Sequence, residues 1–401
     1  MGEFSAAGVL NVYSSAEPDH AVEAYANIFP LCVSPRHPAN QQRALRTAPT
    51  PHPPTPPPFS FPFSFPFSTR SWDWVRINGV TVEALAPAPP DGSNWPVINT
   101  AFVGGATDGA SAAVAHDTAL HALTARRAFF LFDSAVVGLI VNLTCLSRVP
   151  VRTTLASRQL PLPASGDPRA LVAVGLSNGT VERALPDGNY SFPAGAVAWL
   201  NAGGLGVLPD PTLPLGVEVG NKTGSWSAIG PFHGTVEGRL WSAWVEHGAR
   251  FAGAAAGYTL APNTTAGDMP AAAATRAGAA CVVNTPELQG AGAAALDGGG
   301  LLASVVWARG GAATPHCATV GVGFAVDGDG VFLLRLNASH AVATASHPAL
   351  WAAGEARQLT LDRPLKSGEG CTASGALQLT LPPAGDLMGS SVARACELAQ
   401  P

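Results

Sequence analysis

Beyond Trp72, the hydrophobic and polar residues are distributed as in a β-sheet protein. Short runs rich in β-branched and aromatic residues recur along the chain, as in RINGVTVEAL, GTVEGRLWSAWV and GVFLLRL. Turn sequences such as PDG, SNG and DGDG separate these runs at intervals of roughly ten residues. Many short strands at such a spacing favour antiparallel β-sandwiches. The pattern therefore predicts an all-β fold.

A few segments depart from this pattern. Two Ala-rich segments, Ala110–Leu123 and Ala271–Ala280, are predicted to hold a helical turn or two. The sequence AFFLFDSAVVGLIVNLTCL, which starts at Ala128, splits into two apolar runs about residues 133–134 and predicts a buried hairpin. A shift to Ala, Thr and Gly over Asn263–Gly278 predicts a boundary between a larger first sandwich and a smaller second one.

Composition narrows the class of protein. The chain has 401 residues, 47% of them hydrophobic and 12% charged, with a net charge of −5. This balance excludes a disordered polyanion and a basic nucleic-acid-binding protein. No apolar stretch has the length of a membrane span, because the best candidate is interrupted by Asp133 and Asn142. The N-terminal sequence MGEFSAAGVLNVY has neither a basic region nor a long apolar run, so no signal peptide is visible.

Two features nevertheless predict an extracellular, secreted glycoprotein. Six N-x-[ST] sequons are candidate glycosylation sites, at Asn142, Asn178, Asn189, Asn221, Asn263 and Asn337. The six cysteines form no C-x-x-C pair, which argues against a zinc site and leaves one or two disulfides open, with no pairing readable from the sequence. We predict no metal and no cofactor.

Three short motifs invite a functional reading. GLSNG (Gly175–Gly179) fits the G-x-S-x-G pattern of a serine hydrolase, but a strand-like piece and not a helix follows it, so a tight turn is predicted. VDGDG (Val326–Gly330) lacks the remaining ligands of a calcium loop and is also predicted to be a turn. GGATDG, which starts at Gly104, is not followed by the helix that a dinucleotide-binding loop needs.

The histidines and tryptophans do not form an evident catalytic set. His233 and His247 stand beside predicted strands, where a structural role is favoured over a catalytic one. Most tryptophans are predicted to lie in the core, and a few exposed ones would suit stacking on sugar rings. Those in or beside turns and strand ends are Trp72, Trp74, Trp95, Trp226, Trp241 and Trp244.

Several phrases, in order, resemble polysaccharide lyase family 8, which includes hyaluronate, chondroitin AC and xanthan lyases. WDWVRINGVTVE, from Trp72, resembles the family's W-D-W-x-x-I-x-G-x-T, and FVGGATDG, from Phe102, matches F-x-G-G-x-S-D-G. Further phrases follow in family order: ARRAFFLFDSAVVGLIVNL, VRTTLASRQL, PDGNYSFP, NKTGSWSAIG, LWSAWVEHG, GYTLAPN and VVNTPELQG. The resemblance extends from Trp72 to the end of the chain.

Upstream, VLNVYSSAEPDHAVEAYANIFP resembles the segment that precedes the tryptophan motif in the family, so residues 1–30 are assigned to the start of the central β-domain. In the family about one residue separates these two motifs. Here residues 31–71 intervene, and they include the Pro/Phe/Ser-rich run TPPPFSFPFSFPFS. We favour a retained intron, because this run reads as a translated pyrimidine tract, over a polyproline-type linker. If it is translated, the segment is expected to be disordered.

The resemblance implies a large antiparallel β-supersandwich of the galactose-mutarotase type (residues 72–270), followed by a smaller C-terminal β-sandwich (275–401). It also implies a secreted lyase that cleaves uronic-acid-containing polysaccharide by β-elimination. The alternative is a non-catalytic glycan-binding protein of the wall or matrix. The expected partner is an acidic polysaccharide, with no nucleic acid and no membrane, and the protein is expected to be monomeric.

The family's catalytic Asn, His, Tyr and Arg lie in a helical domain that precedes the sandwiches, and this chain matches the family only after that domain. No catalytic residue is therefore carried over, and the chain alone is expected to be inactive. One substrate-binding residue is proposed by position. Trp95, in SNWPVINTAFVGG, stands where the family has an aromatic residue near its cleft, and it is a candidate for stacking on a sugar ring.

Overall fold

The computed structural model describes residues 78–84, 99–108, 111–120, 123–160, 170–182, 184–225, 235–279, 281–295, 298–347, 352–383 and 390–399. Segments 1–30 and 31–71, discussed above, lie outside the described residues. Within the described ranges the chain forms strands β1–β24 and one helix, α3 (Met269–Ala279). The predicted all-β fold is confirmed.

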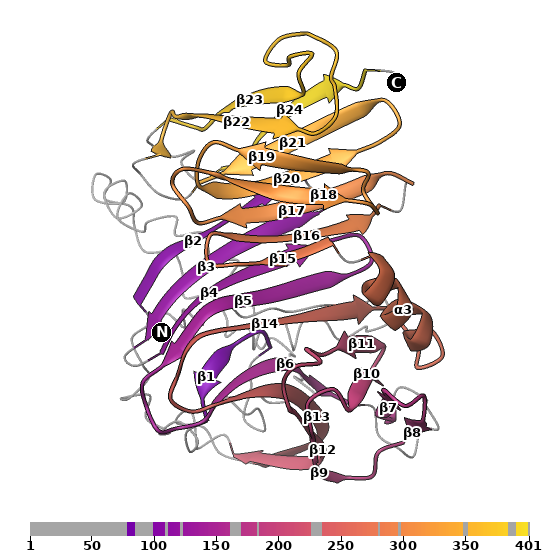
Figure 1. Cartoon of the computed structure of the whole chain (residues 1–401). Helices are drawn as coiled ribbons and strands as arrows, with labels where there is room; N and C mark the ends of the chain where they lie inside the picture. The colour runs from indigo at the N-terminus through magenta and orange to yellow at the C-terminus, as the bar shows by residue number, and fades with distance from the viewer. Residues whose placement is uncertain are drawn as a thin grey trace, which may run out of the picture.

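The strands before α3 form two antiparallel sheets (Figure 1). The five-stranded sheet has, in spatial order, β1 (Thr81–Glu83), β6 (Val151–Gln159), β13 (Thr235–Gly248), β12 (Leu215–Ser225) and β9 (Gly188–Phe192). The nine-stranded sheet has β2 (Asn99–Thr107), β3 (Ala112–Leu120), β4 (Leu123–Leu131), β5 (Val136–Cys145), β14 (Phe251–Pro262), β11 (Leu205–Leu208), β10 (Val197–Ala202), β7 (Ala173–Leu176) and β8 (Val181–Glu182).

The strands after α3 form two further antiparallel sheets. The six-stranded sheet has β15 (Cys281–Asn284), β16 (Leu288–Ala294), β17 (Gly300–Val306), β20 (Gly330–Leu336), β21 (His340–Ser346) and β24 (Val392–Glu397). The four-stranded sheet has β18 (Ala312–Cys317), β19 (Val322–Val326), β22 (Ala356–Leu361) and β23 (Ala376–Thr380).

Alternation along the strands places these sheets in successive layers. On β4, Phe129 packs in the core shared with the five-stranded sheet, whereas its neighbour Phe130 packs against the six-stranded sheet. On β17, Leu301 faces the nine-stranded sheet and Leu302 faces the four-stranded sheet. Because successive side chains of a strand point to opposite faces, the nine- and six-stranded sheets are both buried on two sides. One hydrophobic core joins the two pairs of sheets, so packing does not mark a boundary between two domains. The domain bounds 72–270 and 275–401 therefore stay predictions.

Two of the local predictions are confirmed and one is wrong. The hairpin about Asp133 is present between β4 and β5, and the Ala-rich segment that starts at Ala271 lies in α3 up to Ala279. The other Ala-rich segment, 110–123, is not helical and contains β3. Alanine favours a helix by intrinsic propensity, but Ala113 and Ala115 alternate into the core between two sheets, and β3 pairs with β2 and β4 on its two sides. Tertiary pairing therefore overrides local preference here.

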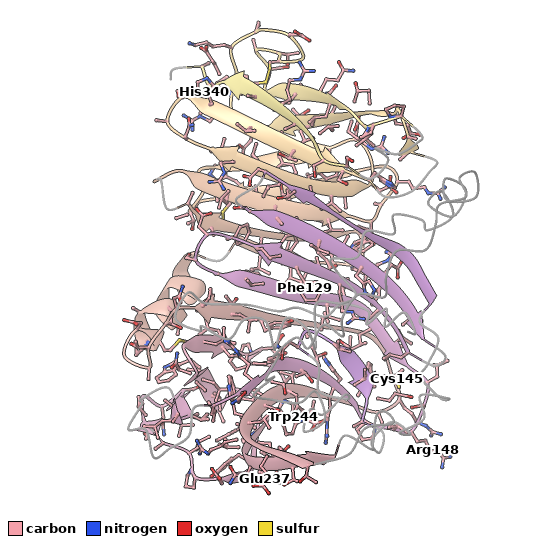
Figure 2. The ribbon with its side chains drawn as sticks, turned by 180° about the vertical axis from the view of Figure 1, so that it is seen from behind. Phe129, Cys145, Arg148, Glu237, Trp244 and His340 are labelled. Atoms are coloured by element: carbon pink, nitrogen blue, oxygen red, sulfur yellow. A yellow bond between two sulfur atoms is a disulfide. The ribbon has the colours of Figure 1, made fainter. Side chains whose placement is uncertain are left out.

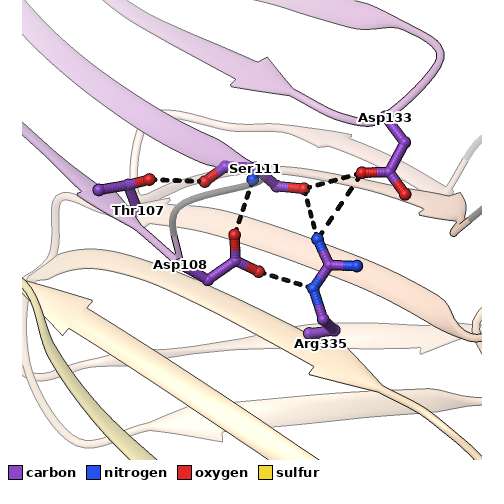
Figure 3. A network of polar contacts seen from close by, with 5 residues as sticks. All are labelled: Thr107, Asp108, Ser111, Asp133 and Arg335. Carbon is purple, nitrogen blue, oxygen red and sulfur yellow. Dashed lines mark hydrogen bonds and ion pairs between the residues drawn. The ribbon is translucent and has the colours of Figure 1, made fainter.

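A polar network, which we call the Arg335 clasp, joins the nine-stranded sheet to the six-stranded sheet (Figure 3). Arg335 of β20 donates from Nε to Asp108 Oδ2 at 2.7 Å and from Nη2 to Ser111 Oγ at 2.9 Å. Asp133 Oδ1 lies 3.7 Å from Arg335 Nη2 and accepts from Ser111 Oγ at 3.3 Å. The backbone N–H of Ser111 donates to Asp108 Oδ1, and Thr107 Oγ1 donates to the Ser111 carbonyl. One guanidinium thus contacts two carboxylates at the junction between the sheets.

Replacing Arg335 by Met is expected to lower the free energy of unfolding by about 2 kcal/mol or more, because Asp108 and Asp133 then face each other without a cation in a partly buried site. Urea unfolding followed by tryptophan fluorescence measures the change. The matched control is Lys366→Met, which removes an exposed ion pair with Glu397 and should change stability by less than about 0.5 kcal/mol. Equal losses in the two variants would show that the clasp contributes nothing specific.

Candidate functional site

The first group of polar side chains with a potential function lies inside the larger sandwich. His116 on β3 and Arg127 on β4 are Cα partners across neighbouring strands. Tyr258 on β14 lies in the core shared by the nine- and five-stranded sheets, and its ring packs over Gly138, where a Cβ atom would stand 2.5 Å from Tyr258 Cζ. Arg127 donates from Nη1 to the Gly79 carbonyl at 3.3 Å, just before β1.

Burial sets the charge of each member of this group. Removal from water lowers the pKa of His116 to about 3, with a further contribution from the Arg127 charge. Burial lowers the pKa of Arg127 to about 10 and raises the pKa of the Tyr258 phenol. At neutral pH the group therefore carries one positive charge, on Arg127. The Tyr258 hydroxyl has no hydrogen-bond partner among the described residues.

His, Tyr and Arg are the residue types that the resemblance described above implies as base, acid and assisting cation of a β-elimination. Here, however, the exposed fractions of His116, Arg127 and Tyr258 are only 4%, 2% and 2%. A polymer cannot reach atoms that are buried to this degree, and an imidazole with a pKa near 3 is a poor base at neutral pH. The group is a buried structural cluster, and the described residues assemble no catalytic set from it.

The described tryptophans do not offer an open ring for sugar stacking. Trp199 and Trp241 lie in the core, in agreement with the expectation that most tryptophans are buried. Trp244 is buried in the five-stranded sheet (Figure 2); its Nε1 donates to Glu246 Oε1 at 2.7 Å, and the guanidinium of Arg152 lies 5.3 Å from the ring centroid. Trp307 is half-buried under Arg126.

The other predicted tryptophan positions cannot be compared with the structure. Trp95, the proposed stacking residue, lies outside the described residues, and so do Trp72, Trp74 and Trp226. The role of Trp95 therefore stays a prediction.

The motifs interpreted as turns are turns. GLSNG connects β7 to β8, with Gly179 at φ +88°, and Ser177 Oγ donates to the Gly195 carbonyl. No helix follows Ser177, so the hydrolase elbow is absent at this position. VDGDG joins β19 to β20, and Asp327 Oδ1 accepts from the backbone N–H of Gln358. Sequence reasoning missed the role of GGATDG, whose Asp108 belongs to the Arg335 clasp.

His247 also has a structural environment, in line with its sequence interpretation. Its Nε2 lies 2.7 Å from Thr153 Oγ1, and its ring lies against Phe251. Burial lowers the pKa of His247 to about 4, although the nearby Asp210 opposes this shift. His233 lies outside the described residues.

The sequons differ in accessibility. Asn142 is half-buried on β5 with a φ of +52°, whereas the side chains of the other sequon asparagines are exposed: Asn178, Asn189, Asn221, Asn263 and Asn337.

The cysteines, whose pairing the sequence left open, form two disulfides, Cys281–Cys317 and Cys371–Cys396, and Cys145 is a buried free thiol. In the part of the chain that the structure describes, no three His, Cys, Asp or Glu residues gather as a metal site would require. No helix among these residues has the length and apolarity to cross a bilayer.

Comparison with known proteins places the chain in a family. Residues 68–273, just over half of the chain, match the super-sandwich domain of polysaccharide lyase family 8. The chain belongs to this family, and the resemblance of its phrases is confirmed. Xanthan lyase from Bacillus sp. (strain GL1) is 31% identical over 174 residues, which are 42% of this chain and 18% of that protein. Chondroitinase-AC from Pedobacter heparinus is 25% identical over 195 residues, 48% of this chain and 26% of that protein.

Solved structures share the arrangement of sheets. Chondroitin AC lyase from Streptomyces coelicolor A3, in complex with chondroitin sulphate, superimposes with a TM-score of 0.61 at 25% identity, over 82% of this chain and 41% of that one. Paenibacillus xanthan lyase has a TM-score of 0.64 at 15% identity, over 81% and 31%, which shows a common fold. The chain spans less than half the length of each of these relatives.

The lowered pKa values of His116 and His247 predict an acid-sensitive fold. An unfolded histidine binds a proton below pH 6.5, whereas folded His247 and His116 resist protonation down to about pH 4 and about pH 3. The unfolded state therefore holds more protons in this window, and stability falls as pH drops from 6.5. At pH 5 each group contributes a loss of about 2 kcal/mol.

Urea unfolding at pH 7.5 and pH 5 measures this dependence. In His247→Gln the stability loss between the two pH values should shrink by about 2 kcal/mol relative to the parent chain, since one protonation is removed. An unchanged difference would mean that His247 is accessible to protons in the folded protein.

Proposed function

We propose that this chain is the β-sheet portion of a secreted polysaccharide lyase that cleaves an acidic, uronic-acid-containing polysaccharide by β-elimination. The observation that carries the proposal is the family match over residues 68–273, which runs through both sheets of the larger sandwich. Relatives named for chondroitin and for xanthan, both acidic polymers, support this substrate class.

The chemistry requires three functions. The uronate carboxylate has to be neutralised so that the C5 proton becomes acidic, a base removes this proton, and an acid protonates the leaving glycosidic oxygen. The described sheets do not present these groups together at an accessible surface, since His116, Arg127 and Tyr258 are buried. We therefore propose that a helical domain outside this chain supplies the catalytic residues and that the sheets support it.

Two observations support secretion. Disulfides persist mainly in oxidising compartments, and both disulfides lie in the part of the chain after α3. Five sequon asparagines have exposed side chains, as a glycosylation acceptor requires.

The decisive test begins with the transcript. Sequencing from its 5′ end through the codon for Trp72 is expected to show a reading frame that continues upstream into a helical domain, with residues 31–71 spliced out. The protein encoded by that frame should release unsaturated uronates, detected by their ultraviolet absorbance, from chondroitin or xanthan. The 401-residue chain, assayed in parallel, should release none. If the longer protein is also inactive but still binds these polymers, the chain is part of a non-catalytic glycan-binding protein.

Glycan mapping tests the glycoprotein assignment. When the chain is secreted from a eukaryotic host, glycans are expected at Asn178, Asn189, Asn221, Asn263 and Asn337, and not at half-buried Asn142. Mass spectrometry of peptides before and after removal of N-glycans measures each site. Ser339→Ala should abolish modification at Asn337 alone, because it destroys that sequon. A chain without glycans would contradict the assignment.

A further inference from the structure

Two neighbouring connections between the five- and nine-stranded sheets form one corner of the molecule. Residues 146–150 lead from β5 to β6, and residues 249–250 lead from β13 to β14. At one end Cys145 is the Cα partner of Phe251, and at the other end Val151 is the partner of Gly248. The two connections therefore run side by side. We call this surface the Arg148/Arg250 corner, and Figure 2 shows Arg148 at the rim of the molecule, near Cys145.

The corner carries two cations without a partner among the residues that the structure describes. Arg148 and Arg250 are both exposed, and neither makes an ion pair or hydrogen bond with any described residue. Many other arginines of the described chain pair with carboxylates, as Arg152 does with Glu246 and Arg239 does with Asp187. In a chain with only 12% charged residues, two free guanidiniums on adjacent turns are a distinctive feature.

The backbone at Arg250 is a second, independent observation. Its φ is +55°, in the left-handed region that glycine occupies at many other positions of this protein. The other non-glycine residues with positive φ are Asn142 and Asn263, and asparagine tolerates this conformation. Arginine has no such advantage, and Gly248 and Gly253 hold positive φ values nearby. Strained residues that persist in a fold are often retained for function, and here the side chain is a free cation.

From these observations we propose that the Arg148/Arg250 corner binds an acidic polysaccharide. Guanidinium groups donate two parallel hydrogen bonds to a carboxylate or a sulfate, and Leu146 of the same turn is 74% exposed and can contact the apolar face of a sugar ring. Two cations on adjacent turns suit a polymer with repeated anionic groups better than a single small anion. The proposal deepens the proposed function and rests on it for the substrate class.

The carboxylates near the corner do not form ion pairs with its two arginines. Glu246 is engaged by Arg152 (Oε1 to Nε, 2.8 Å) and by Trp244 Nε1, and the Glu83 carboxylate lies 3.8 Å from the Cys145 thiol. Neither carboxylate contacts Arg148 or Arg250. Arg152 and Glu246 offset each other, so the two guanidiniums of the corner face one remaining carboxylate of this pair, that of Glu83. The resulting attraction for a polyanion should weaken as salt rises.

The test measures binding of the 401-residue chain to immobilised chondroitin sulphate at low and at physiological salt, with neutral dextran as the reference polymer. Arg148→Ala/Arg250→Ala is expected to weaken binding by about fivefold to tenfold. The charge-matched control is Arg363→Ala/Lys366→Ala in the smaller sandwich, which should bind as the parent does. Arg250→Gly should weaken binding while raising the Tm, because it removes a cation and relieves the positive φ.

Three results would overturn the inference: no binding of chondroitin sulphate by the parent chain, equal binding of dextran, or the same loss in the control variant as in the corner variant. These results are separate from the proposed function, which is judged by release of unsaturated uronates from the longer reading frame. If the longer protein is active and the corner variants bind normally, only the proposal that the corner binds polysaccharide is refuted. An inactive protein whose corner variants bind weakly refutes only the lyase assignment.

Discussion

The fold depends on two sheets that are apolar on both faces. All seven residues of β17 are buried, because alternate side chains face the nine-stranded sheet and the four-stranded sheet. On the opposite side of the contact, small residues such as Ala113, Ala115 and Ala128 allow the two sheets to approach closely. Non-polar burial of this kind supplies most of the stabilisation of a layered β-protein. It also couples the two pairs of sheets, so the part after α3 is not an independent appendage.

The phrases that identify the family have structural roles in this chain. Asp108 ends the phrase FVGGATDG and Asp133 follows FFLF, and both reach Arg335, more than 200 residues later in the sequence. Gly138 is required by the ring of Tyr258. Relatives named for two different polymers, xanthan and chondroitin, match this part of the chain.

The chain has few charged residues, and many of those that the structure describes form ion pairs. Arg335 holds two carboxylates at the contact between sheets, and Arg357 contacts Asp329 and Glu355 in the smaller sandwich. Since unpaired charges are costly inside a protein, pairing is the expected state of any buried cation. The free arginines at the corner are exposed and carry no such cost. Arg148 and Arg250 are therefore available to bind an anion, whereas Arg335 and Arg357 stabilise the fold through their ion pairs.

Local patterns were enough to predict the all-β class, the hairpin about Asp133, the helix that covers residues 271–279 and the family, because period-two patterning and ordered phrases are local signals. They also predicted that GLSNG and VDGDG are turns. The strand at residues 112–120 could be recognised only in the tertiary structure, because its pairing with β2 and β4 overrides the helix propensity of alanine. The tertiary structure alone paired the cysteines, assembled the Arg335 clasp and buried His116, Arg127 and Tyr258. Each of these depends on contacts between residues far apart in the chain, which no local pattern encodes.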